Sequence, residues 1–206
     1  TGFGKKFINA GDKQWGAKMH DDLLDAVKWA VEAGIADAKR IAIMGGSNGG
    51  LLVGAVEIQR PDLFGAAIPM VGVLDMLRFQ QFTAGQFWRD EYGYIEKEDE
   101  FKSLLAYSPY HNIKAGTCYP PTLVTTADHD DRVYPAHSFK FAARLQESQA
   151  GDAPMPMVGM RSAPVTARAA SSLVASITMA NAPASCTARA SCRIASAWAG
   201  VLPCTL

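Results

Sequence analysis

A serine with glycines on both sides is the first feature of this sequence that could do chemistry. Segment 45–50 reads Gly-Gly-Ser-Asn-Gly-Gly and contains the pattern G-x-S-x-G centred on Ser47. On a tight turn between a strand and a helix, such a serine exposes its hydroxyl above the sheet. The backbone N–H of Asn48 would then stabilise a developing oxyanion. The pattern predicts a nucleophilic serine; a glycine-rich turn with an idle serine, or a phosphate loop, is the alternative.

An acidic loop further along the chain could supply the acid of a catalytic triad. Segment 128–132 reads Asp-His-Asp-Asp-Arg and directly follows the apolar run 121–127. A serine nucleophile needs a base, and in folds with this serine turn the acid follows the serine while the histidine follows the acid. Side chains at the C-terminal ends of parallel strands share one edge of the sheet. A solvated, turn-forming acidic cluster is the alternative interpretation.

The elements that must position these loops alternate between helix and strand. Three segments have helical character: 21–33, 48–60 and 136–149. Three short apolar runs are typical of buried parallel strands: 40–44, 66–71 and 121–127. This alternation predicts an α/β fold with a doubly wound, mostly parallel sheet.

Composition limits the partners. The 206 residues include 20 basic and 20 acidic side chains, and the two signs are interspersed, so no basic footprint for nucleic acid exists. No apolar run reaches the roughly 18 residues that a membrane span needs. Four cysteines without a C-x-x-C pair favour a reducing compartment. We expect no nucleic-acid or membrane partner, no metal or other cofactor, and a cytoplasmic location, or a periplasmic one if a signal precedes the first residue.

Residues 1–152 resemble the prolyl oligopeptidase family of serine peptidases, and from about residue 45 to 150 they are most similar to its prolyl endopeptidase branch. The following segments carry the resemblance: 45–52, 60–64, 71–76, 87–93, 107–112 and 126–133. The resemblance implies an α/β-hydrolase fold, here truncated at both ends. It also implies a β-propeller domain upstream in the full-length protein.

The resemblance assigns roles to individual residues. In the family's acid loop, the first aspartate after the histidine is the triad acid and the arginine binds a substrate carbonyl; these roles fall on Asp130 and Arg132. Trp88 matches the tryptophan that stacks on the proline ring at the cleavage position, and Tyr92 and Val73 would line the same pocket. The implied activity is hydrolysis of short peptides after proline.

Alternatives remain open at several of these positions. Read without the family, Trp88 would be a core aromatic and Arg132 could pair with Asp131. Segments 1–4 and 15–22 are more similar to the acylaminoacyl-peptidase and dipeptidyl-peptidase branches. An acylaminoacyl-peptidase or esterase-like specificity, or a catalytically dead remnant, is therefore the second hypothesis.

The histidine that should complete a triad is missing from the chain. No histidine follows His137, whereas the base should come some tens of residues after Asp130. Residues 157–206 contain no Asp, Glu, Lys or His, and they show no helical or strand period. If G or C ends the relevant codons, the neighbouring reading frame across 163–168 spells Ala-Gly-His-Gly-Ala-Gly, which resembles the family's histidine loop.

We therefore hypothesise that a frameshift near residues 154–162 replaced the natural C-terminus. Residues 1–153 would then be a partial peptidase domain, and 154–206 a poorly ordered tail foreign to the family. A triad enzyme without its base retains only the roughly 10³- to 10⁴-fold rate enhancement of binding and oxyanion stabilisation. The 206-residue chain should accordingly be nearly inactive.

Overall fold

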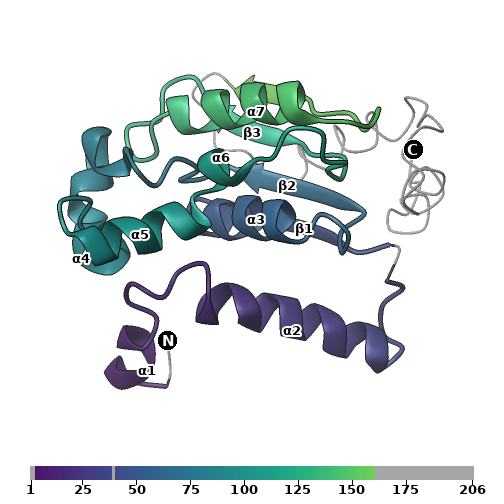
Figure 1. Ribbon diagram of the computed structural model, residues 1–206, viewed down its shortest axis with the longest axis horizontal. Coiled ribbons are helices and arrows are strands. Elements are labelled where there is room, and N and C mark those ends of the chain that lie inside the picture. The colour runs from purple at the N-terminus through teal and green to yellow at the C-terminus, as the bar shows by residue number, and fades with distance from the viewer. Residues whose placement is uncertain (1–2, 39, 161–206) are drawn as a thin grey trace.

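A parallel sheet lies at the centre of the fold (Figure 1). The structure, a computed structural model, describes residues 3–38 and 40–160, and in these ranges the sheet has four strands in the order β1-β2-β3-β4. Their bounds are β1 Ala42–Gly46, β2 Ala66–Met70, β3 Val124–Ala127 and β4 Met157–Met160. All three strand pairs are parallel. The loops that follow the strands therefore open at one common edge of the sheet.

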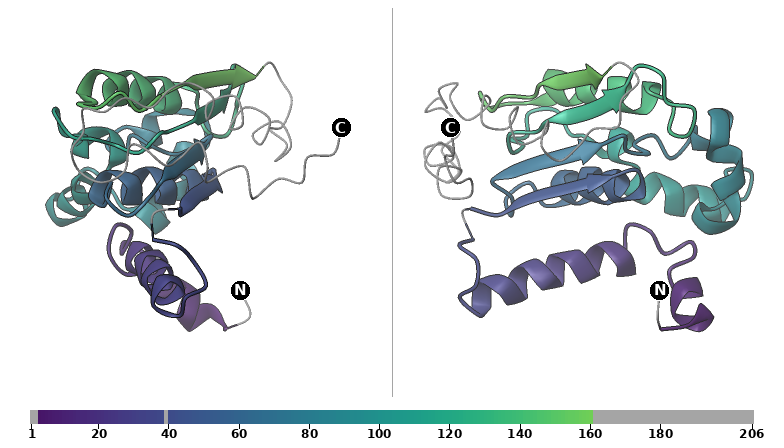
Figure 2. Two further views of the ribbon diagram at one scale, coloured as in Figure 1. Left: turned by 90° about the vertical axis from the view of Figure 1, so that its right-hand side faces the viewer. Right: turned by 180° about the vertical axis from the view of Figure 1, so that it is seen from behind.

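Helices α3 and α7 lie on the same face of the sheet (Figure 2). The helices of the described residues are α1 Lys5–Asn9, α2 Lys18–Glu32, α3 Asn48–Gln59, α4 Arg89–Tyr92, α5 Glu98–Tyr107, α6 Pro109–Asn112 and α7 Ala136–Ser148, with 3₁₀ turns η1 Phe79–Gln81 and η2 Thr83–Trp88. α3 is buried over most of its length, as expected for a helix between the sheet and other helices. None of these helices is long and apolar enough to cross a membrane.

The observed elements confirm the predicted α/β-hydrolase fold. The predicted helices 21–33, 48–60 and 136–149 correspond to α2, α3 and α7, and the three predicted strands correspond to β1, β2 and β3. The observed boundaries of these helices and strands differ from the predicted ones by a few residues, which is common at the ends of such elements.

One strand forms within the segment in which the sequence shows no helical or strand period. Met157–Met160 form β4, which pairs residue for residue with β3. A four-residue strand that contains a glycine is too short to show a period, and its extended conformation comes from the neighbouring strand. The sheet thus continues past the predicted boundary at residue 153. The remainder of the predicted tail, 161–206, lies outside the described residues.

A glutamate is completely buried under the sheet. Glu57 of α3 has no exposed surface, and its only hydrogen-bond partner among the described residues is the hydroxyl of Thr122, 3.4 Å from Oε2. Burial raises the pKa of Glu57 well above its ordinary value, and the bond from Thr122 offsets this only in part. Burial therefore favours the neutral, protonated form of Glu57.

Replacing Glu57 with glutamine should remove a pH-dependent loss of stability. A raised pKa in the folded state means that Glu57 favours folding below its ordinary pKa and destabilises as the pH rises towards its folded value. We expect Glu57→Gln to be more stable than the natural chain at pH 9 and to flatten the pH profile. Urea unfolding from pH 5 to 9 measures this. Glu32→Gln on the exposed surface of α2 is the control, and an unchanged profile for Glu57→Gln would contradict a neutral carboxyl.

A histidine is buried among aromatic rings near the start of α2. His20 has no exposed surface, and neither ring nitrogen finds a hydrogen-bond partner in the described residues. The rings of Trp15 and Tyr107 approach it edge-on, at centroid distances of 6.4 Å and 6.0 Å. Burial lowers the pKa of His20 from 6.5 to about 4, although Asp21 opposes the shift. The ring is therefore neutral at physiological pH.

His20 should make the fold sensitive to mild acid. The unfolded chain takes up a proton near pH 6.5 and the folded chain only near pH 4, so stability falls as the pH drops through this window. The full loss is about 3 kcal/mol. His20→Phe should abolish this part of the pH dependence in chemical denaturation at pH 4–7. His129→Phe, at a side chain that is 84 % exposed, should leave it intact.

Candidate active site

Ser47 occupies the sharp turn between β1 and α3. Its backbone angles are φ 58° and ψ −115°, in a region that residues other than glycine rarely adopt. Its N–H donates a 2.9 Å hydrogen bond to the carbonyl of Met70 at the end of β2. The strand–turn–helix arrangement that the G-x-S-x-G pattern requires is therefore present, and the turn is fastened to the neighbouring strand.

Two glycines permit this turn. A Cβ on Gly45 would lie 2.4 Å from the carbonyl oxygen of Gly49. A Cβ on Gly50 would lie 2.6 Å from the carbonyl oxygen of Met70 and 2.7 Å from the Cα of Gly72. Contacts this short with backbone atoms exclude any side chain. Glycine at these positions lets the turn close and lets the first turn of α3 touch the backbone that follows β2.

The N-terminus of α3 begins immediately after the serine. Asn48 is the first helical residue, and the first backbone amides of a helix have no carbonyl partner within that helix. The helix dipole places partial positive charge at the same end. An anion that forms beside Ser47 would therefore meet both backbone N–H groups and a favourable field.

The acid loop, residues 128–135, follows β3. Oδ1 of Asp130 accepts hydrogen bonds from the backbone N–H groups of Arg132 and Val133, both at 2.9 Å. The half-buried Asp130 carboxylate is thus held by its own loop. β2 separates β1 from β3, so the strand ends that carry Ser47 and the acid loop are about 10 Å apart at the common edge. A triad that uses both loops would need an imidazole between them.

None of the four histidines hydrogen-bonds the candidate nucleophile or the candidate acid within the part of the chain that the structure describes. His20 is buried in the core, and the side chain of His129 is 84 % exposed beside Asp128. His111 and His137 are engaged in a separate polar network. The same described residues contain no cluster of three or more His, Cys, Asp or Glu that could hold a metal ion.

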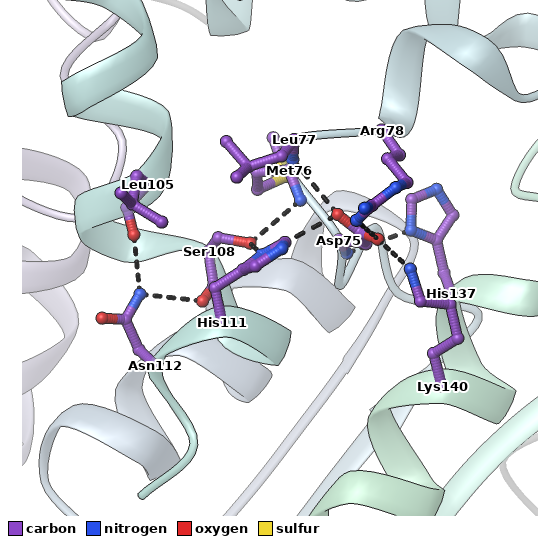
Figure 3. A network of polar contacts seen from close by, with 10 residues as sticks. All are labelled: Asp75, Met76, Leu77, Arg78, Leu105, Ser108, His111, Asn112, His137 and Lys140. Carbon is purple, nitrogen blue, oxygen red and sulfur yellow. Dashed lines mark hydrogen bonds and ion pairs between the residues drawn. The ribbon is translucent and has the colours of Figure 1, made fainter.

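That network surrounds the buried side chain of Asp75 (Figure 3). The ammonium of Lys140 forms an ion pair with its Oδ2, and Arg78 approaches the same oxygen at 3.4 Å. The backbone N–H of Asp75 donates to Nδ1 of His137 at 3.0 Å, and its Oδ1 accepts from the N–H of Leu77 at 3.2 Å. Burial alone would raise the pKa of Asp75, but the bond and charge of Lys140 hold it below its ordinary value.

Sequence reasoning missed this network, although a signal existed. Asp75 interrupts the apolar run 71–77, and a charge in a buried run requires a partner. The network also contains a serine, a histidine and an aspartate, but not in a catalytic arrangement. Ser108 Oγ, at 2.8 Å, and Asp75 Oδ1, at 3.8 Å, both approach the same nitrogen, Nδ1 of His111. Ser108 is fully buried, so the group is structural.

The predicted substrate residues differ in their exposure. Val73 and Tyr92 are 1 % and 4 % exposed, so their side chains belong to the core. Trp88 is half-buried and meets Tyr92 edge-on, with ring centroids 6.4 Å apart. We call the buried group to which Val73 and Tyr92 belong the site cluster: Trp15, Leu51, Val73, Met76, Phe79, Tyr92, Leu104, Tyr107 and Val133. It links the residues beneath the serine turn, the acid loop and Trp88.

The side chain of Arg132 is exposed at the acid loop. No ion pair joins it to Asp131 in the described ranges, so it does not form the surface pair that was its alternative explanation. Its backbone carbonyl accepts a 3.4 Å hydrogen bond from the hydroxyl of Thr83. The loop that holds Asp130 therefore touches the segment that leads to Trp88.

Several known proteins are similar to this chain in sequence and in fold. The sequence model of the prolyl oligopeptidase family matches residues 1–162. The prolyl endopeptidase of Elizabethkingia miricola is 53 % identical over 149 residues, which are 72 % of this chain and 21 % of that protein. The prolyl endopeptidase of Dictyostelium discoideum is 43 % identical over 145 residues, 70 % of this chain and 19 % of its own length. The chain thus spans about a fifth of these relatives.

Solved structures agree with the sequence relatives. One chain from a structural and mechanistic analysis of two prolyl endopeptidases is 52 % identical, with a TM-score of 0.73; the match covers 76 % of this chain and 23 % of that one. Prolyl oligopeptidase B from Galerina marginata, bound to a 35mer substrate, is 38 % identical with a TM-score of 0.74, over 78 % of this chain and 23 % of its own. This chain belongs to the prolyl oligopeptidase family of serine peptidases.

Proposed function

We propose that this chain is part of the catalytic domain of a serine peptidase that cleaves short peptides after proline, with Ser47 as its nucleophile. The observation that carries the proposal is the strained backbone of Ser47, at φ 58° between a parallel strand and a buried helix. Such strain persists where the surrounding structure enforces it, and it is typical of residues that do chemistry. Membership of the prolyl oligopeptidase family supports the same role.

In the proposed reaction, Ser47 Oγ attacks the peptide carbonyl and gives its proton to the base. The peptide C–N bond then breaks, the base passes the proton to the leaving amine, and water hydrolyses the acyl-enzyme that remains. The N–H of Asn48 stabilises the oxyanion at the positive end of α3. Asp130 orients the base: its Oδ1 is occupied by two backbone amides, and its Oδ2 accepts no bond from the described residues. Oδ2 is therefore open to the N–H of an imidazole, which a triad acid must bind.

The base itself is proposed to be a histidine in the loop after β4. β4 is the parallel neighbour of β3, so a loop after Met160 opens at the same sheet edge, about 5 Å from the acid loop. The sequence has no histidine after His137, which supports replacement of the natural C-terminus by a frameshift. Sequencing the encoding DNA across residues 150–206 tests this, because an A or T at the codon ends that the shifted histidine loop requires would overturn it.

Substrate choice is proposed to rest on the half-buried Trp88 and the exposed Arg132. Trp88 would stack on the proline ring, and Arg132 would bind a carbonyl of the peptide backbone. Val73 and Tyr92 are buried beneath, so they would shape the floor of the pocket.

The relatives are about five times longer than the matched segment, and we propose a β-propeller domain upstream and a cytoplasmic location. If the enzyme cleaves esters or acylamino peptides but no peptide bond after proline, an esterase-like or acylaminoacyl-peptidase specificity would replace the proposed one.

A fluorophosphonate probe tests the nucleophile. The 206-residue chain should be labelled slowly, because no base activates the hydroxyl. A chain with the shifted histidine loop restored should react at least about 10³-fold faster, and mass spectrometry should locate the label on Ser47. Ser47→Ala should abolish labelling in both chains. Fast labelling of the 206-residue chain would show that some base already operates and would refute the proposed inactivity.

Substitution of Asp130 by asparagine tests the acid. The amide oxygen can still accept both backbone hydrogen bonds, so the loop should keep its conformation. In the chain with the histidine loop restored, kcat on a proline-containing chromogenic peptide should fall about 10⁴-fold, because the imidazole loses its orientation. The neighbouring, exposed Asp131→Asn is the control. Equal activity of both variants would place the acid elsewhere.

A further inference from the structure

The two ends of the segment that carries Trp88 contact each other. Residues 79–92, the specificity segment, comprise η1, η2 and α4. Its two ends meet where Phe79 and Tyr92 contact edge-on, with ring centroids 5.4 Å apart. Both rings are buried in the site cluster. Because its two ends are packed together, the position of Trp88 depends on the position of the whole segment.

One aromatic side chain of this segment lies against the acid loop. The ring of Phe82 stacks on Tyr134 at a centroid distance of 5.2 Å and an interplanar angle of 19°. The same ring meets His137, at the start of α7, edge-on at 5.0 Å. Beside it, the hydroxyl of Thr83 donates to the carbonyl of Arg132 at 3.4 Å. Phe82 and Thr83 thus contact the acid loop and the helix that follows it at three residues.

The backbone here is shaped to make these contacts. Phe82 is extended, at φ −106° and ψ 126°, and interrupts the two 3₁₀ turns. Thr83 has φ 27°, which is strained for a β-branched residue. Strain of this kind costs on the order of 1–3 kcal/mol and persists only where neighbouring contacts impose it. The contacts with the acid loop are the ones that the structure supplies.

The other side of the contact is rigid. Nδ1 of His137 accepts the backbone N–H of the buried Asp75, and Lys140, one turn further along α7, pairs with the Asp75 carboxylate (Figure 3). His137 is therefore fixed against the chain that follows β2. The ring of Phe82 rests on a surface that cannot easily shift.

We propose that Phe82 and Tyr134 are positioning residues that set the distance between Trp88 and Arg132. The inference rests on the proposed function, because it concerns how the two proposed substrate contacts are held in register. A peptide that uses both contacts needs the specificity segment and the acid loop at a fixed separation. The attack of Ser47 on a small probe needs neither contact. The two residues therefore govern peptide binding and not the reactivity of the serine.

The test compares peptide affinity with serine reactivity in the 206-residue chain. Calorimetric titration with a blocked proline-containing tetrapeptide gives the affinity, and the fluorophosphonate labelling rate gives the reactivity. Phe82→Ala should weaken peptide binding about two- to tenfold, the range of one aromatic pair, and leave the labelling rate within about twofold. Phe82→Tyr should restore binding, because it keeps the stack. Phe139→Ala, which removes a partly exposed ring of α7, is the matched control and should bind normally.

The outcomes separate the two proposals. Failure of the unsubstituted 206-residue chain to bind the peptide would count against the proposed function. Normal binding by Phe82→Ala would overturn the positioning role alone. If Phe82→Ala does not fold, the peptide affinity of Tyr134→Ala tests the positioning role instead. The side chain of Tyr134 is 45 % exposed, so its removal leaves the core intact. Tyr134→Ala must then weaken peptide binding by the amount expected for Phe82→Ala, and normal binding by Tyr134→Ala would overturn the positioning role. Where Phe82→Ala does fold, the double variant must show no further loss, because independent effects would contradict a shared contact.

Discussion

The geometry of the site depends on the contact between the serine turn and the backbone that follows β2. Ser47 donates its N–H to Met70, and Val71 donates its own to Thr125 of β3, at 2.9 Å and 2.8 Å. The ends of three adjacent strands are thus tied by backbone hydrogen bonds. Ser47 and Val71 both have positive φ, at 58° and 42°, so each strand turns sharply away just beyond its last pairing. Because these restraints are made by the backbone, the relative position of serine turn and acid loop tolerates most side-chain changes but not a side chain at Gly50.

The site cluster packs beneath the loops that this backbone frame positions. Leu51 lies four residues after the serine and Val133 three residues after the candidate acid, and both are buried in the same cluster as Tyr92. A side chain on each functional loop is therefore held by common apolar packing. Burial of a large side chain of this kind stabilises by roughly 1.5–3 kcal/mol, which exceeds the contribution of an exposed ion pair. The half-buried Trp88 packs against the same cluster, so its position depends on this packing.

The sequence predicted those parts of the molecule that depend on local pattern. Runs apolar on both faces identified β1, β2 and β3, and the glycine spacing around Ser47 identified the turn. The short helices α4 and α6 and strand β4 were not predicted, because four residues carry no period and their conformation is imposed by their neighbours. The network of Asp75 escaped for a different reason. Its partners come from segments up to 65 residues apart, and only the fold brings Lys140 to the carboxylate.

Two aspartates in this molecule show why residue types alone do not define a catalytic site. Asp75 is enclosed, and its carboxylate is paired with Lys140 and Arg78, as a buried charge requires. Asp130 is bound by amides through one oxygen and keeps the other for a new donor. The first carboxylate has charged partners on its Oδ2 and backbone and histidine neighbours at its Oδ1, whereas the second leaves one oxygen available. A serine, a histidine and an aspartate within reach of one another therefore become a triad only when each partner takes a different atom of the imidazole, and His111 fails this condition because both neighbours approach its Nδ1.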